Sequence, residues 1–378
     1  MPEARFDIAI AGGGPVGLAL AAMLAARGVP ASRIALIDAR PVELAAQDPR
    51  AIALSYGSRQ LLTAVNAWPA NATPITQIHV SRRGSFGRTL IDSEDYRLSA
   101  LGYVCRYGDV VQALAHAVPV SVAQYRPARV DDRREYDDRV ALQLSTGESL
   151  TASLVVQAEG GVFSDQPARA LQRDYSQVAL IATVQSTHAP PGRAFERFTD
   201  EGPLALLPQD EGYSMVWCMR PERATSLLAL NDAGFLNALQ QAFGQRVGQF
   251  TGVGKRDDYP LGLNAGPVAT VRTIAIGNAA QTLHPVAGQG LNLGLRDAAV
   301  LASLLARACS PDTLTRFESQ RRGDRGTTIR ITDLMARVFA GTSDGSLLQS
   351  VLGLSLGAID VAPTAKRWLA DRMMFGSR

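Results

Sequence analysis

The first forty residues show the hydrophobic pattern of a strand, a helix and a second strand. Residues 6–11 form a short apolar run that predicts a strand, and an Ala- and Leu-rich segment up to about Arg27 predicts a helix. A second apolar run, residues 34–37, ends on Asp38. This order is typical of a βαβ unit built on a parallel sheet, so the sequence predicts an α/β domain at the start of the chain.

A similar pattern returns late in the chain. Residues 274–276 form another apolar run that predicts a buried strand, and this run stops at Gly277. A loop rich in Gly and Pro follows. Apolar side chains then recur at helical spacing, which predicts a helix that begins near Gly290 or Leu291; these side chains are Leu291, Leu295, Ala298, Ala299 and Ala302.

The middle of the chain has the pattern of short strands. Residues 75–91 predict a hairpin, and residues 120–156 predict a β-meander. Between residues 168 and 256, short β-type runs alternate with Gly, Pro and Asp turns and include one helical segment, 235–243. This pattern predicts a second, mostly antiparallel sheet inserted into the first domain. The end of the chain is helical, with predicted helices at 314–325, 328–340, 347–359 and 364–374.

These patterns predict a discontinuous arrangement of domains. We expect a dinucleotide-binding domain from residues 1–72, 99–165 and 260–340, and a β-sheet domain for the substrate from residues 73–98 and 166–259. C-terminal helices would occupy residues 341–378. The predicted fold is therefore an α/β domain with an α+β insert.

Composition narrows the functional classes. Among 378 residues the net charge is only +3 and aromatic residues make up 6%, so we expect no nucleic-acid partner. The three cysteines are far apart and the four histidines form no metal-binding motif, so we expect no disulfide framework and no metal site. The start is unlike a signal peptide, and no apolar run approaches the ~20 residues that span a bilayer. We therefore expect a cytoplasmic protein.

The first glycine-rich loop predicts dinucleotide binding. The run Gly12-x-Gly14-Pro15-Val16-Gly17 follows the first strand directly and opens the first helix. In such a loop the first glycine makes a tight turn, the second lets the backbone approach a pyrophosphate, and the third lets helix and strand pack closely. Asp38, at the end of the second strand, stands where an acid would bind a ribose hydroxyl. It could instead be a capping or surface carboxylate.

The second glycine-rich loop suggests a long cofactor held at both ends. Between Gly277 and the predicted helix, backbone N–H groups near Gly288 and Gly290 can approach a flat, electron-rich group, and the helix dipole adds positive charge there. We expect cofactor contacts from this second loop at Gly277, Asn278, Gly288, Gln289, Gly290, Leu291 and Asn292.

Several isolated residues have two interpretations. Arg50 and Arg106 could hold cofactor phosphate or ring, or Arg50 could be a surface arginine. Glu159, followed by glycine at a strand end, could face ribose or phosphate or lie in an ordinary turn. The charges of Arg321, Arg322 and Arg325 are typical of a solvated helix face.

Three glycine-containing segments, 12–17, 159–160 and 277–278, follow one another along the chain. Their order resembles that of the single-component, group A flavoprotein aromatic hydroxylases, which have the para-hydroxybenzoate hydroxylase fold. The segments 48–55 and 277–297 are similar to those of the ubiquinone-biosynthesis hydroxylases, and Asn278 and Gln281 resemble the 2-polyprenyl-6-methoxyphenol hydroxylase branch. Two residues depart from the broader group, which has Asp-Gly at Glu159–Gly160 and Gly-Asp at Gly277–Asn278. Because this chain has Glu159 where the broader group has Asp, the role of that Asp in binding FAD and nicotinamide carries over to Glu159 less directly.

The resemblance implies FAD as the cofactor, NADH or NADPH as a transient reductant, and O2 as co-substrate. It implies a monooxygenase that hydroxylates the ring of a polyprenylated phenol through a flavin C4a-hydroperoxide, with Pro285 lining the flavin face. The family's substrates also imply an apolar groove and delivery from a membrane or carrier, so association with the inner membrane, a biosynthetic complex or a second copy stays open. The alternatives are hydroxylation at another ring position, a smaller phenol, or a non-catalytic FAD-binding scaffold subunit.

Overall fold

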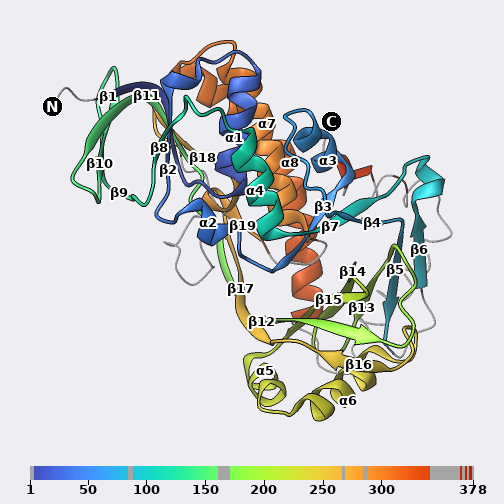
Figure 1. Ribbon diagram of the computed structural model, residues 1–378. Helices are drawn as coiled ribbons and strands as arrows, with labels where there is room; N and C mark the ends of the chain where they lie inside the picture. Colours follow the sequence, from blue (N-terminus) through green and yellow to red (C-terminus); the bar gives the residue numbers. More distant parts are fainter. Residues whose placement is uncertain are drawn as a thin grey trace.

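The computed structural model describes residues 4–83, 88–160, 171–265, 269–283 and 288–340, together with 367, 371–372 and 374–376. Pro285 and most of the predicted helices at 347–359 and 364–374 lie outside the described residues. Figure 1 shows two bodies, one built on a sheet that contains the N-terminal strand and one built on a larger sheet, with helix α8 running between them.

The first body is built on a seven-stranded sheet of order β8-β2-β1-β11-β10-β9, in which β18 also pairs with β11. Strands β8, β2, β1, β11 and β18 run parallel, and β10 and β9 are antiparallel. The strands are β1 (Ala4–Ala11), β2 (Ile34–Ile37), β8 (Ala123–Tyr125), β9 (Val130–Glu135), β10 (Val140–Leu144), β11 (Ser149–Gln157) and β18 (Thr273–Ala275). The predicted meander at 120–156 is therefore wrong at its start, because β8 joins β2 in parallel.

Helices cover this sheet and form the largest core. Helix α1 is buried on nearly all sides, as expected for a helix rich in Ala and Leu between a sheet and other helices. The helices of this body are α1 (Pro15–Ala26), η1 (Ala31–Arg33), α2 (Val42–Ala45), α3 (Tyr56–Thr63), α4 (Tyr107–Ala117), η4 (Gly277–Ala279), α7 (Gln289–Leu305) and α8 (Pro311–Ala340), whereas η2 (Ser93–Tyr96) packs against strand β6 (Arg88–Asp92) of the large sheet. Helix α8 is continuous where the sequence predicts two helices.

A small antiparallel sheet and a large one complete the fold. The small sheet has the order β3-β7-β4, formed by β3 (Ala51–Ser55), β4 (Thr73–Ile75) and β7 (Gly102–Arg106). The large sheet has nine strands in the order β19-β17-β12-β15-β14-β13-β5-β6, with β16 paired to β12. All its pairs are antiparallel except β13 with β5. The predicted mostly antiparallel second sheet is confirmed.

The nine-stranded sheet packs differently on its two faces. Its outer face carries the second large core, which includes Leu204, Met215 and Trp217 beneath helices α5 and α6. Its inner face turns toward the small sheet. The remaining elements are β5 (Gln77–Arg82), β6 (Arg88–Asp92), β12 (Leu171–Ser186), β13 (Arg193–Phe198), β14 (Pro203–Gln209), β15 (Gly212–Met219), α5 (Pro221–Leu228), α6 (Asp232–Phe243), β16 (Phe250–Val253), β17 (Asp257–Ala265) and β19 (Gln281–Thr282).

Candidate functional site

Three glycine-bearing loops meet at one edge of the seven-stranded sheet. Strands β1, β11 and β18 lie side by side in parallel, with Ala11 beside Gln157 and Gln157 beside Ala275. Because the carboxyl ends of parallel strands share one edge, the loops after these strands lie close together. The structure thus brings together the predicted landmarks 12–14, 159–160 and 277–278, which are far apart in the sequence.

The first loop has the geometry of a tight turn that opens a helix. Gly12 has φ +108°, and a Cβ there would lie 2.4 Å from the carbonyl carbon of Ala158. A Cβ on Gly17 would lie 1.8 Å from the carbonyl oxygen of Gly12. Neither position tolerates a side chain, whereas a Cβ on Gly14 would meet only the hydroxyl of Tyr107, at 3.5 Å. Gly14, which precedes Pro15 at the start of α1, therefore borders open space.

Asp38 lies against this first loop. One of its carboxylate oxygens accepts a hydrogen bond from the backbone N–H of Gly13 at 2.6 Å, and the other accepts one from Arg40 at 2.7 Å. Glu159 lies beside the same turn, since a Cβ on Gly12 would lie 2.5 Å from its backbone nitrogen. Burial and the charge of Asp38 both raise the pKa of Glu159. The two acids predicted from strand ends therefore lie in one place, next to the glycine turn.

Arg126 is a residue of this region that the sequence did not indicate. Its guanidinium donates hydrogen bonds to the carbonyls of Gly13 and Arg40, and its buried Nε has no partner among the described residues. Burial lowers its pKa, and the nearby charge of Asp38 offsets part of that effect. Arg126 follows a three-residue strand with no motif around it, so only the parallel pairing of β8 with β2 reveals its position.

The second and third loops form a cradle with the start of α7. A Cβ on Gly160 would meet nothing closer than the Cβ of Asn278, at 3.7 Å, and one on Gly290 would meet only the Oδ1 of Asn278, at 4.0 Å. Helix α7 begins at Gln289, after Gly288 with φ +59°, and Gly288 has no side chain that could cap the helix. This open, glycine-lined end of a helix suits a flat, negatively charged group.

Val16 packs the cradle tightly from behind. A Cβ on Gly277, which has φ +59°, would lie 3.1 Å from a methyl group of Val16, and one on Gly294 would lie 2.7 Å from it. Helices α1 and α7 therefore approach each other as closely as their glycines allow. This packing fixes the first loop relative to the third.

Asn292 anchors the start of α7 to strand β3. Its side-chain oxygen accepts hydrogen bonds from the N–H of Ser55 and the hydroxyl of Ser58, and its amide nitrogen donates to the carbonyls of Ala53 and Gly288. The side chain is 2% exposed. Asn292 thus directs all four of these bonds to protein, so its effect on a bound cofactor would act through the position of Gly288.

A buried ionic cluster supports the third loop from below. Asp297 is 0% exposed and accepts hydrogen bonds from Arg321 at 2.7 Å and Arg325 at 2.9 Å, and also from the N–H of Gly277. Burial opposes ionisation of Asp297, but the two arginines outweigh it and lower its pKa. The predicted solvated face is therefore wrong for Arg321 and Arg325, which are 4% and 9% exposed, and it holds for the exposed Arg322.

The two predicted arginines of this region have different surroundings. Arg50 forms a bidentate pair with Asp48, with Nη2 2.6 Å from Oδ2, and its guanidinium lies over the rings of Tyr107 and Tyr259. The hydrogen bonds and charge of Asp48 raise the pKa of Arg50 despite its burial. Arg106 is exposed and pairs with Asp210 of the large sheet at 3.0 Å. Arg50 therefore joins the strand below Gly288 to the large sheet.

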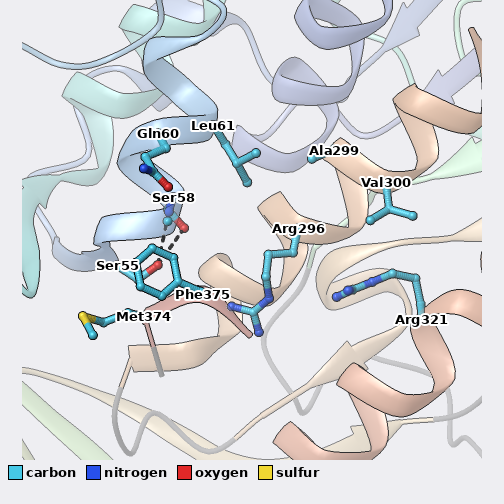
Figure 2. Close-up of a pocket in the computed structure, with 11 residues that line it drawn as sticks. Ser55, Ser58, Gln60, Leu61, Arg296, Ala299, Val300, Arg321, Met374 and Phe375 are labelled. Carbon is cyan, nitrogen blue, oxygen red and sulfur yellow. Dashed lines mark hydrogen bonds between the residues drawn. The ribbon is translucent and has the colours of Figure 1, made fainter. Parts of the chain in front are cut away.

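A cavity of about 270 Å³ lies on the other side of α7 from this cradle, between α3, α7 and α8. Figure 2 shows the side chain of Arg296 entering it beside Phe375. Nε of Arg296 pairs with Asp324 at 3.0 Å, whereas its two Nη atoms have no hydrogen-bond partner in the part of the chain that the structure describes. Ser55 and Ser58, which bind Asn292, also line this cavity, so it belongs to the packing around the anchor.

Two absences hold for the described part of the chain. There, no group of three His, Cys, Asp or Glu side chains could hold a metal ion. Within the same residues, no helix is long and apolar enough to span a bilayer.

Comparison with known proteins identifies what this site resembles. Residues 5–326 match the family model described as "FAD binding domain". The chain is 32% identical to the ubiquinone hydroxylase UbiL of Rhodospirillum rubrum, covering 96% of this chain and 87% of that protein. It is 30% identical to the 3-demethoxyubiquinol 3-hydroxylase of Escherichia coli, covering 96% of both chains.

A solved structure supports the fold. The p-nitrophenol 4-monooxygenase PnpA of Pseudomonas putida superposes with a TM-score of 0.76 at 17% identity, covering 99% of this chain and 100% of that one. The expected para-hydroxybenzoate-hydroxylase-like fold is confirmed.

Proposed function

The chain belongs to the FAD-dependent monooxygenases that share this FAD binding domain, and from that premise we propose that it hydroxylates the ring of a polyprenylated phenol in ubiquinone biosynthesis. The substrate we propose is 2-polyprenyl-6-methoxyphenol. NADH or NADPH, typical of the family, would reduce the FAD, and O2 would supply the new hydroxyl oxygen.

The residues of the cradle fit FAD. Gly14, Gly160 and Gly290 each border space that a Cβ would enter, and Gly12 and Gly17 hold the first turn closed. The first loop would hold the pyrophosphate. Asp38 would bind a hydroxyl of the adenosine ribose, either while keeping its hydrogen bond from the N–H of Gly13 or after losing it. Glu159, Gly277 and Asn278 would contact the middle of the cofactor. This open cradle, at the meeting point of three parallel strand ends, is the observation that supports the proposal most.

Bound FAD supplies the redox chemistry and the activation of oxygen, and the protein supplies position and electrostatics. The backbone N–H groups at the start of α7 would face the ring end and stabilise negative charge there, as donors of an oxyanion hole do. Such a donor is worth about 3 kcal/mol. Pro285 as a lining of the flavin face stays a prediction, and so do the cofactor contacts of Arg50, Arg106, Gln289 and Leu291.

The substrate would lie between the cradle and the inner face of the large sheet. The division into an FAD domain at 1–72, 99–165 and 260–340 and a substrate domain at 73–98 and 166–259 is part of this proposal. A polyprenyl tail requires an apolar path, so we also propose a cytoplasmic enzyme that meets its substrate at the inner membrane or on a biosynthetic complex.

Product analysis tests this function. In a strain that lacks the protein, we expect 2-polyprenyl-6-methoxyphenol to accumulate, and the purified protein with FAD should hydroxylate it. Accumulation of a precursor without the methoxy group, or of a later one such as a demethoxyubiquinol, would move the reaction to another ring position. Bound FAD without turnover of any phenol would favour a scaffold subunit.

A further inference from the structure

The inner face of the large sheet carries a carboxyl group that is not part of the glycine cradle. Glu196 lies on β13, two residues from Ala194, and Ala194 packs against Ile75 and Val104 of the small sheet. Since alternate residues of a strand share a face, Glu196 points to the same side as Ala194. This side lies opposite the core beneath α5 and α6.

The row of side chains across the sheet at Glu196 is apolar. In register, Glu196 lies beside Val80 of β5 and beside Ala205 of β14, Ala205 beside Val216, and Val216 beside Ile181. The row therefore offers small and branched apolar side chains across five neighbouring strands. Such a surface suits an aromatic ring or an alkyl tail and gives a carboxylate nothing to bond.

Glu196 has no partner among the described residues. It forms none of the hydrogen bonds or ion pairs found there, although native proteins satisfy nearly all buried polar groups. Glu196 is half-buried. This burial raises its pKa to about 7. A partly buried acid without a protein partner often marks a functional site.

The titratable groups around this face leave Glu196 unpaired. Cys218 lies diagonally across β14, and burial, with the charge of Glu196, raises the pKa of its thiol. Arg82 continues β5 past Val80, and Asp257 lies at the far end of the row beside Ile181. From the facing elements, Arg50 stacks on Tyr259 of β17 and is neutralised by Asp48. None of these groups bonds to Glu196.

Two contacts link the large sheet to the cofactor cradle, one at its β19 edge and one through the small sheet, where Ala53 pairs with Val104 and Val104 packs with Ala194. Strand β19 follows Asn278 by three residues and pairs with β17 of the large sheet, Thr282 beside Asn264. At the other side, Gly288 lies against Ala53 of β3, where its Cβ would be 3.2 Å from that of Ala53. The loop that would hold the ring end of FAD is therefore joined to the sheet that presents Glu196.

We propose that Glu196 is a substrate-binding acid, whose carboxylate accepts the hydrogen bond of a phenolic hydroxyl while the ring and its tail lie on the row Val80, Ala205, Val216 and Ile181. The inference rests on the proposed function and deepens it. When the phenol O–H proton moves to the carboxylate, the bonding electron pair stays on the phenol oxygen. The ring becomes more electron-rich at the positions ortho and para to that oxygen, which favours attack on an electrophilic oxygen.

Two substitutions at this position and one control test the inference. Glu196→Gln keeps the shape but accepts a proton poorly, Glu196→Asp keeps the acid, and Glu222→Gln changes an exposed acid of α5 on the other side of the sheet. Each full-length protein would be loaded with FAD, and NADPH oxidation and hydroxylated product would be measured with a short-chain 2-prenyl-6-methoxyphenol. We expect Glu196→Gln to retain FAD but to lose at least tenfold in kcat/KM for the phenol. Glu196→Asp should recover part of that loss, and Glu222→Gln should match the wild type.

The outcomes separate the two proposals. Glu196→Gln with full FAD content and wild-type kcat/KM for the phenol would overturn the role of Glu196 while leaving the hydroxylase function intact. A wild-type protein that binds FAD but responds to no phenol would overturn the proposed function, and the role of Glu196 with it.

Discussion

Two acids in this protein, the buried Asp297 and the half-buried Glu196, have opposite surroundings. Asp297, under the third glycine loop, accepts five hydrogen bonds, from the backbone of Gly277 and the side chains of Gln281, Arg321 and Arg325. Glu196, on the inner face of the large sheet, accepts none among the described residues. Burial opposes ionisation in both, yet the arginines lower the pKa of Asp297, whereas the pKa of Glu196 rises to about 7.

The contrast separates a region whose buried charges are paired within the protein from a region whose carboxyl group has no protein partner among the described residues. Around Asp297 every charge has a counter-charge, and the cluster fixes the loop that follows β18. Among the described residues, neither the carboxyl group of Glu196 nor the space beside Gly14, Gly160 and Gly290 is filled by a protein partner, which is expected where a ligand completes the structure. Stability should therefore depend on the first region and ligand binding on the second.

Removing the charge of Asp297 should have the largest effect. Asp297→Asn removes the carboxylate that Arg321 and Arg325 share and leaves them only Asp324 and Glu318 as counter-charges. Breaking such a buried pair costs about 3–5 kcal/mol. Urea unfolding should show this loss, and FAD should be released because Gly277 loses its support. Asp138→Asn, which removes an exposed pair with Arg139, is the control and should cost less than about 1 kcal/mol. Equal costs for the two substitutions would contradict the comparison.

Removing the anchor at Asn292 should come next. Asn292→Ala leaves the backbone groups of Ala53, Ser55 and Gly288 without their partner, and unsatisfied buried groups cost about 1–3 kcal/mol each. We expect a total loss of about 3 kcal/mol in urea unfolding, together with weaker FAD binding. A variant with wild-type stability would show that water or rearrangement replaces the anchor.

Neutralising Glu196 should stabilise the protein by an amount that grows with pH. Because its folded pKa lies above the ordinary 4.5, the folded state binds the proton more tightly, and stability falls as pH rises from about 4.5 to about 7. Glu196→Gln avoids that loss. Allowing for partial water access, we expect the variant to be more stable by about 2 kcal/mol at pH 8 and equal to the wild type near pH 4. Thermal unfolding at both pH values would check this, and a destabilised variant at pH 8 would mean that Glu196 has a stabilising partner.

Filling the cradle at Gly14 should have the smallest effect on the fold and a specific effect on the cofactor. A Cβ at Gly14 clashes with no protein atom, so Gly14→Ala should unfold like the wild type. It should weaken FAD binding about tenfold, or about 1.4 kcal/mol, because the backbone can no longer approach the pyrophosphate. Titration of the apoprotein with FAD would measure this. Unchanged affinity would place the pyrophosphate elsewhere.

The sequence could predict what local pattern determines. The turn at Gly12, Gly14 and Gly17 is encoded within six residues between a strand and a helix, and the loop from Gly277 to α7 is equally continuous. The mostly antiparallel second sheet follows from alternating runs and turns. These features need no knowledge of distant contacts.

The other parts of the site depend on partners far apart in the chain. Arg321 and Arg325 have the spacing of a solvated helix face, and only Asp297 on a neighbouring helix makes them buried. The role of Asn292 depends on Ser55, 237 residues earlier. Glu196 lies in the run Arg-Ala-Phe-Glu-Arg-Phe, where the inward face is decided by pairing with β5 and β14. Nothing local distinguishes it from a surface acid.

The most direct test of the proposed hydroxylation follows the oxygen atoms of dioxygen into the products. The FAD-loaded protein would be supplied with NADPH, isotopically labelled dioxygen and a 2-polyprenyl-6-methoxyphenol, and the products would be analysed by mass spectrometry. A monooxygenase should place one labelled oxygen atom in a new ring hydroxyl, and the phenol should stimulate NADPH consumption. NADPH consumption that yields only hydrogen peroxide, with the phenol recovered unchanged, would contradict it.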